Sequence, residues 1–283
     1  MDNSYEQVRE WGLVLDAEDI PYGSDYDPET GGWRLVVAPE HAERAAMVLR
    51  AWRRENRAEP QPVDEADWGW TPAGLGVALL LVLGFLVSGP REAGARYFSR
   101  GAAVGTRILD GEWWRTVTAL TLHADLGHIL ANSLFGALFF GEVARAFGPG
   151  LGLGLLLLSG MGGNALNAFL QFDGQSSVGA STAVFGAIGL LGGRQLVRRL
   201  ARGQRGGRAW LPVSAALGLL VLTGMGPETD VFAHVLGFAV GLPLGALAAW
   251  LAPKPPPRPA QWALLAATAG LVAVSWWLAL GAA

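Results

Sequence analysis

A series of long apolar segments occupies the chain beyond residue 70 and constrains its fold more than any other feature. Seven such segments lie near 70–89, 126–144, 150–172, 179–193, 209–225, 231–251 and 260–281. A helix needs roughly 20 apolar residues to cross about 30 Å of hydrocarbon, and most of the segments are this long. Because hydrocarbon offers backbone groups no hydrogen-bonding partner, each segment must be helical. The sequence therefore predicts an all-α polytopic membrane protein.

Composition agrees with this class. Of the 283 residues, 51% are hydrophobic and 16% charged, which is typical of multi-span membrane proteins. Charge is unevenly distributed, because residues 1–67 hold 16 acidic and 7 basic side chains, whereas the remainder holds 8 and 14. Cysteine is absent, so disulfides and thiolate metal sites are excluded. The N-terminus lacks the pattern of a cleavable signal peptide, and we expect the first span to direct membrane insertion.

The acidic N-terminal region has the pattern of a small α+β domain. Helices are predicted over 5–18 and 40–57, and a strand over 33–37 follows a Gly-Gly turn. The predicted organisation runs as a soluble cytosolic domain at 1–60, a linker at 61–69, a six-helix core at 70–251, a Pro-rich linker at 252–259 and an additional span at 260–283.

Basic residues in the connections predict the orientation, because cytoplasmic loops are enriched in Lys and Arg. Nine such charges are predicted to be cytoplasmic: Arg145, Arg194, Arg198, Arg199, Arg202, Arg205, Arg208, Lys254 and Arg258. The connection over 90–115 carries five arginines yet must lie outside, so we expect it to fold at the interface. The segment at 179–193 is short, and we expect its helix to begin below the outer surface, with room for water and substrate above it.

Ser181 and His234 begin two of the predicted spans at the same outer level. Polar side chains are costly in hydrocarbon unless partnered, so their matching depth suggests an assembled site. A histidine can take the proton of a serine, and the free amides of a helix N-terminus can stabilise an oxyanion. The alternatives are a helix N-cap for Ser181 and a packing role for His234.

His123, His128 and Asn132 form a second polar cluster around the start of another span. His128 and Asn132 are four residues apart, so they share one helix face and can donate hydrogen bonds to one point. A zinc site is the competing interpretation. Histidines without an inward carboxylate or cysteine fit zinc poorly, and Asp125 is better interpreted as a surface residue, so we expect neither metal nor cofactor.

Glycines at helical spacing follow both reactive side chains. Gly237, Gly241 and Gly245 continue the stripe from His234, and Gly186 and Gly189 lie below Ser181. Small residues let membrane helices approach closely, which would bring the serine to the histidine. General helix packing explains any one of these glycines equally well.

Taken together, the motifs resemble those of the rhomboid family of intramembrane serine proteases over about residues 70–251. They are Gly179-Ala-Ser-Thr-Ala-Val-Phe-Gly186, His123 with His128 and Asn132, Ala233-His-Val-Leu-Gly-Phe-Ala-Val-Gly241, Trp114-Arg115 and Gly141-Glu142. The resemblance implies a six-helix core, extended here by a seventh span, that cleaves transmembrane protein substrates within the lipid bilayer. It suggests a bacterial inner membrane with the N-terminus cytoplasmic and the site opening outward, and it implies no nucleic-acid partner.

The resemblance also implies residue roles. Ser181 would be the nucleophile and His234 the general base of a dyad without a third carboxylate, while His128, Asn132 and the Ser181 amide would stabilise the oxyanion. Supporting positions would be His123, Gly179, Phe185 against the catalytic histidine, Gly237, Gly241 and Arg115. Thr182 departs from the commoner glycine at its position. An inactive relative that binds transmembrane helices is the alternative function, and a transporter, for which we detect neither midplane charges nor internal repeats, is a third.

Overall fold

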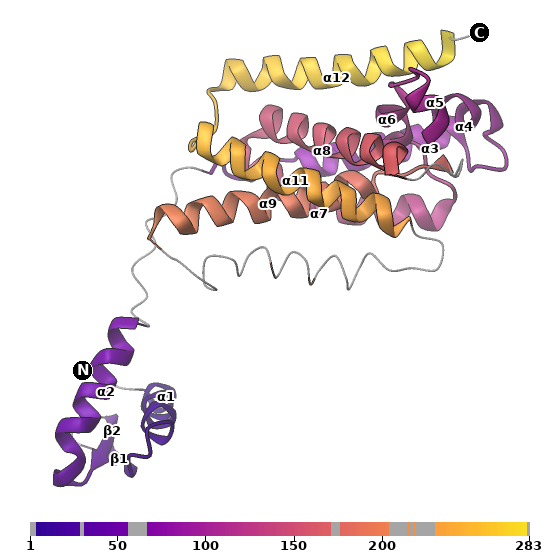
Figure 1. Cartoon of the computed structure of the whole chain (residues 1–283). Coiled ribbons are helices and arrows are strands. Elements are labelled where there is room, and N and C mark those ends of the chain that lie inside the picture. Colours follow the sequence, from indigo (N-terminus) through magenta and orange to yellow (C-terminus); the bar gives the residue numbers. More distant parts are fainter. Residues whose placement is uncertain are drawn as a thin grey trace. The chain divides into compact units, whose positions relative to one another are not determined.

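The computed structural model describes residues 4–28, 31–55, 67–170, 176–203, 214, 218 and 230–281. The chain divides into two compact units, Met1–Val63 and Asp64–Ala283, and Figure 1 labels their elements. The span predicted near 209–225 lies outside the described residues, apart from the two isolated positions.

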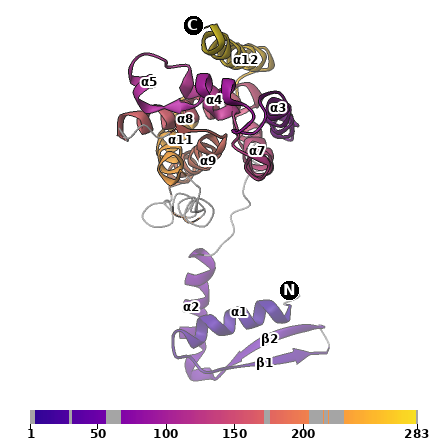
Figure 2. The same cartoon turned by 90° about the vertical axis from the view of Figure 1, so that its right-hand side faces the viewer.

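The first unit is a small α+β fold. Its elements are α1 (Tyr5–Asp16), β1 (Tyr22–Asp27), β2 (Gly32–Val37), η1 (Pro39–His41) and α2 (Ala42–Glu55). The strands form an antiparallel hairpin in which Tyr22 is opposite Val37, and Figure 2 shows this hairpin with both helices. Leu15, Ile20 and Ala45 form its buried core. The strands confirm the predicted α+β architecture, although β1 was not predicted because its sequence is polar.

The second unit is built from long helices. They are α3 (Ala73–Ser88), α7 (Leu126–Phe147), α8 (Pro149–Leu170), α9 (Ser181–Ala201), α11 (Val231–Leu251) and α12 (Arg258–Gly281). By length and composition, α7, α8, α11 and α12 can each cross a membrane, and α3 is a shorter apolar helix. The outward leucines of α3, such as Leu80 and Leu86, are 67% and 72% exposed, as lipid-facing side chains are. The protein is therefore an integral membrane protein of the predicted all-α class.

The helix that begins at Ser181 is longer than its apolar sequence predicted. It continues through Arg194 and Arg198 to Ala201, because Asp67 accepts hydrogen bonds from both guanidinium groups, at 2.5 and 3.3 Å. Arg145 at the end of α7 binds the other oxygen of Asp67 at 2.8 Å. Burial alone would raise the pKa of Asp67, but the hydrogen bond from Arg194 and the charges of all three arginines hold it below its ordinary value. The arginine ends of α7 and α9 are thus joined at the end opposite Ser181.

The arginine-rich connection after α3 is folded, as expected, rather than a simple loop. It contains α4 (Ala95–Gly101), β3 (Ala103–Val104), α5 (Gly105–Leu109), α6 (Arg115–Thr118) and η2 (Ala119–Thr121), and β3 pairs with β4 (Ser176–Ser177). Arg115 organises it, because this side chain is only 1% exposed and donates to the carbonyls of Ser99 and Ala102, each at 2.9 Å, and to Glu112. Figure 1 shows these elements gathered at one end of the bundle.

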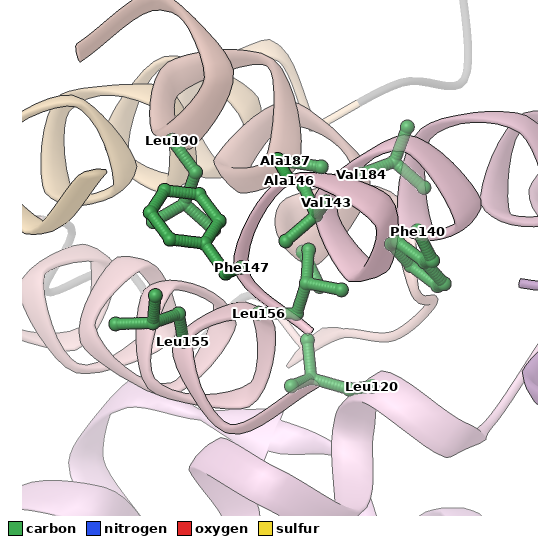
Figure 3. Close-up of a cluster of buried hydrophobic side chains, with 11 residues drawn as sticks. Leu120, Phe140, Val143, Ala146, Phe147, Leu155, Leu156, Val184, Ala187 and Leu190 are labelled. Carbon is green, nitrogen blue, oxygen red and sulfur yellow. The ribbon is translucent and has the colours of Figure 1, made fainter. Parts of the chain in front are cut away.

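A continuous apolar core joins α7, α8 and α9. Figure 3 shows its side chains interdigitating between the three helices. The buried members are Leu120, Phe140, Val143, Ala146, Phe147, Leu155, Leu156, Ala183, Val184, Ala187 and Leu190. Since Ala183 and Val184 lie within the first turn of α9, this core fixes the helix directly below Ser181.

Gln261 attaches α12 to the rest of the unit. Its Oε1 accepts from the amides of Gly150 and Leu151 at the start of α8, at 2.7 and 2.9 Å, and its Nε2 donates to the carbonyls of Phe147 and Pro256. The side chain is 2% exposed, and a Cβ on Gly148 would overlap it, whereas a Cβ on Gly150 would overlap the backbone carbonyl of Gln261. The side-chain amide of Gln261 therefore caps the start of α8 and also binds the end of α7 and the segment before α12.

We predict that Gln261→Leu destabilises the protein, because it keeps the volume while removing the hydrogen bonds of four backbone groups, two of them in buried contacts. Each such group costs about 1–3 kcal/mol, so thermal unfolding in detergent will begin at a clearly lower temperature. Thr268→Val is the matched control, since Thr268 is half-buried on the same helix and the described bond of its hydroxyl is to Leu264 within that helix. Equal unfolding temperatures for the Gln261 variant and the wild type would contradict this anchoring role.

Candidate active site

The backbones of α9 and α11 touch along one face of each helix. A Cβ on Gly237 would overlap the carbonyl of Thr182, and one on Gly241 would overlap the carbonyl of Gly186. From the opposite side, a Cβ on Gly189 would overlap the carbonyl of Phe238. The close approach predicted from the glycine spacing is present, and it leaves no room for a side chain between the helices.

This approach brings the first turns of the two helices together. Ser181 is the first residue of α9 and is partly buried, whereas His234 lies in the first turn of α11 and is 5% exposed. Phe185, one turn below Ser181, packs on the imidazole of His234 with ring centroids 4.3 Å apart. Serine and histidine therefore occur at matching ends of adjacent helices.

The turn before Ser181 depends on a glycine. Gly179 has φ +120°, a conformation that side chains disfavour, and its amide donates to the carbonyl of Ala119 at 2.9 Å. The N-cap of α9 is Ala180, and among the described residues no side chain caps the helix. This geometry disfavours an N-cap role for Ser181, and the amides of the first turn have no carbonyl partner within the helix.

His128 borders the same space. Its Nδ1 accepts a hydrogen bond from the amide of Ala124 at 3.3 Å, so in the neutral imidazole the proton resides on Nε2. A Cβ on Gly179 would lie 2.5 Å from this Nε2 and 3.6 Å from the hydroxyl oxygen of Ser181. A hydrogen-bond donor and the serine hydroxyl thus flank one glycine, whose missing side chain keeps the space open.

Asn132 lies one turn below His128 and is 5% exposed. Its Nδ2 donates to the carbonyl of His128 at 2.9 Å, which leaves one further N–H on the amide. The sequence suggested that both side chains donate to one point. In the structure the described hydrogen bond of the Asn132 side chain is instead made with the carbonyl of His128 in the same helix.

His123 binds the backbone of the turn before Ser181 (Gly179 and Ala180), which we call the serine turn. The side chain is fully buried, and its Nε2 accepts a long hydrogen bond from the amide of Ala180 at 3.4 Å. Its ring lies 5.2 Å from that of His128. The two histidines therefore contact the serine turn through different atoms, one at the backbone and one beside the hydroxyl.

The described hydrogen bonds of the Asp230 carboxylate are made with groups other than the His234 ring. Asp230 is the N-cap of α11, with Oδ1 accepting from the amide of Ala233 at 2.9 Å and Oδ2 accepting from Asn167 at 3.2 Å. Asn164, one turn earlier, is 3% exposed and donates to the carbonyl of Thr116. Sequence reasoning overlooked both asparagines, although two amides at helical spacing in an apolar segment are a signal of polar packing.

The fold and site define a class: a polytopic helical membrane protein with a serine and a histidine at matching ends of two touching helices. Residues 110–251, half of the chain, match the Rhomboid domain, and the chain belongs to the rhomboid family.

Proteins of similar sequence are also named as rhomboid proteins. RHOMBOID-like protein 4 of Arabidopsis thaliana is 40% identical over 149 residues, covering 51% of this chain and 36% of the relative. Rhomboid protease GluP of Bacillus subtilis is 33% identical over 117 residues, covering 41% and 23%. The putative rhomboid protease YdcA of the same species is 28% identical over 171 residues, covering 60% and 85%. The chain thus spans about a third or less of the first two relatives' length.

We predict that Gly179→Ala destabilises the protein by about 1–3 kcal/mol. An alanine is strained at the φ of +120° that this position adopts, and its methyl group would meet the His128 ring. Thermal unfolding of the purified protein measures the loss. Gly76→Ala is the control, since a Cβ there meets nothing within 4 Å and alanine favours the helix. Equal unfolding temperatures for the two variants would contradict the strain.

Proposed function

We propose that the protein is an intramembrane serine endopeptidase that hydrolyses peptide bonds in or near transmembrane segments of membrane proteins. The observation that carries the proposal is the backbone contact of α9 with α11, which sets Ser181 and His234 at one level with Phe185 packed on the imidazole. Membership of the rhomboid family, and relatives that are named proteases, support the same activity.

In the proposed reaction His234 takes the proton of Ser181 as the hydroxyl attacks the scissile carbonyl carbon. The carbonyl oxygen becomes an oxyanion, which accepts hydrogen bonds from Nε2–H of His128, from the Ser181 amide and from the second N–H of Asn132. His234 then gives the proton to the leaving amine, and the acyl group remains on Ser181. Water, deprotonated by the same histidine, attacks the acyl carbon, and His234 returns the proton to the Ser181 oxygen as the second product leaves.

The site favours a dyad rather than a triad. Asp230 accepts two hydrogen bonds, from the helix amide of Ala233 and from Asn167, so its carboxylate already has partners. Phe185 packs on the imidazole at an interplanar angle of 33°, and this contact helps to orient the ring.

The substrates are proposed to be transmembrane proteins with a locally unstable helix. A peptide bond inside a regular helix is hydrogen-bonded and shielded, so Gly, Pro or polar residues near the outer end of a span would favour cleavage. We propose a bacterial inner membrane with the arginine ends of α7 and α9 in the cytoplasm and the site opening outward. The cluster of Arg145, Arg194 and Arg198 around Asp67 supports this orientation.

We predict that Ser181→Ala and His234→Ala each reduce cleavage of a reference transmembrane substrate by about 10⁴-fold or more, because the variants lack the proposed nucleophile or the proposed base. Product formation in detergent, with unfolding temperature as a check on folding, measures this. Asp230→Asn is the control, since asparagine also caps helices. A loss of about a thousandfold in the control would instead indicate a triad, and cleavage that survives Ser181→Ala would refute the proposal and favour the helix-binding alternative.

We predict that His128→Ala and Asn132→Ala lower kcat by about 10²–10³-fold with little change in KM, because oxyanion donors act in the transition state. The larger effect belongs to His128, whose donor lies beside Ser181, whereas Asn132 bonds its own helix. Leu130→Ala, an exposed position on the same helix, serves as the control. A change confined to KM would assign these residues to substrate binding.

A further inference from the structure

A cavity of about 330 Å³ lies in the folded connection that follows α3. Its lining includes two arginines, Arg91 and Arg107, together with the ring of Phe98 and the backbone near Ser176. None of the described residues that line it is acidic. The volume is at the lower end of the range of small-ligand pockets, about 300–1,000 Å³. A cavity of this size with two cations is suited to a compact anionic group.

The local contacts hold Arg91 in place without neutralising it. Its Nη2 donates to the carbonyl of Ser176 at 3.3 Å, and its guanidinium carbon lies 5.6 Å from the centroid of Phe98. Within the described chain no carboxylate pairs with Arg91. Arg107 pairs with Glu112 at 3.7 Å, an exposed contact that contributes little. Both guanidinium groups retain N–H donors for an anion.

Aromatic residues that adjoin the cavity lining in sequence or by contact are of the kinds that gather at the level of lipid headgroups. Arg91 is three residues beyond Ser88, the last residue of α3. Tyr97 packs on Trp276 near the end of α12, and Trp277 beside it is 73% exposed. Tryptophan and tyrosine concentrate at the membrane interface, where a bilayer presents its phosphates.

We propose that this cavity binds the phosphate of an anionic phospholipid headgroup, with Arg91 and Arg107 as its ligands and Phe98 against the glycerol. Inorganic phosphate shares this chemistry, but a lipid is favoured because the acyl chains can remain in the bilayer beside α3. The site also explains why an arginine-rich connection is tolerated on the side where the orientation disfavours it: lipid phosphates balance the charge.

The cavity is linked to both halves of the candidate active site. The amide of Arg91 donates to the carbonyl of Ala124 at 2.8 Å, and the amide of Ala124 bonds His128. On the other wall, Val104 pairs with Ser176, and this strand ends at Ser177, two residues before Gly179. A bound phosphate would therefore fix the position of His128 relative to the serine turn. This effect on cleavage rests on the proposed function, whereas lipid binding does not.

The test measures binding in the Ser181→Ala protein, so that its result does not depend on protease activity. Full-length protein is placed in phosphatidylcholine bilayers with and without phosphatidylglycerol, and retained lipids are counted by native mass spectrometry. We expect retained phosphatidylglycerol, and about fivefold weaker retention in Arg91→Gln and in Arg107→Gln. Arg96→Gln is the matched control, because Arg96 is exposed on the same connection and does not line the cavity.

Equal weakening by Arg96→Gln would overturn the proposal, because diffuse surface charge would then explain the binding. Retention of inorganic phosphate, or of an acidic peptide, without retention of phosphatidylglycerol would overturn the lipid assignment. A second arm uses the active protein, in which phosphatidylglycerol is expected to raise cleavage in the wild type and in Arg96→Gln but not in Arg91→Gln. If lipid binds as predicted while no variant cleaves, the proposed function fails and the lipid site stands.

Discussion

The contact between the backbones of α9 and α11 is the constraint on which the rest of the site depends. In a bilayer, apolar side chains gain little by leaving lipid for protein, so helices are held by close packing and by hydrogen bonds. Gly237 and Gly241 permit that packing, because their hydrogens face the carbonyls of Thr182 and Gly186. A larger residue at either position would separate the helices and, with them, the serine from the histidine.

Buried polar side chains also stabilise the fold, by hydrogen bonds to backbone groups outside the contact of α9 with α11. Arg115 binds two carbonyls of the arginine-rich connection, Asn164 binds a third, and Gln261 caps α8. Each satisfies backbone groups that irregular structure would otherwise leave unpaired at membrane depth. The same rule explains why His123 binds the amide of Ala180: a turn with a positive φ at Gly179 cannot satisfy its own amides.

Features encoded by neighbouring residues could be predicted from the sequence, and those set by distant contacts could not. The apolar runs predicted α7, α8, α11 and α12 to within a few residues, and the glycine spacing predicted the contact of α9 with α11. The extension of α9 was missed because it depends on Asp67, which is remote in sequence. Pairing of β3 with β4 was missed for the same reason. The orientation of Asn132 was missed although its described bond is local, to the carbonyl of His128 one turn earlier.

The two ends of the bundle are held by interactions of different strength. At the arginine end, charged hydrogen bonds of 2.5 and 2.8 Å join Asp67 to two helices. Around Ser181, neutral hydrogen bonds of 3.3 and 3.4 Å join the histidines to the surrounding backbone, beyond the most common length of about 2.9–3.0 Å. Because long neutral bonds can be broken or shortened at small cost, the contacts of the two histidines can adjust while the bond of Gly179 to Ala119, at 2.9 Å, and the core below Ser181 keep α9 in place. Catalytic hydrogen bonds commonly tighten only when substrate is bound, and under the proposed function this unequal anchoring would permit such tightening without movement of the helices.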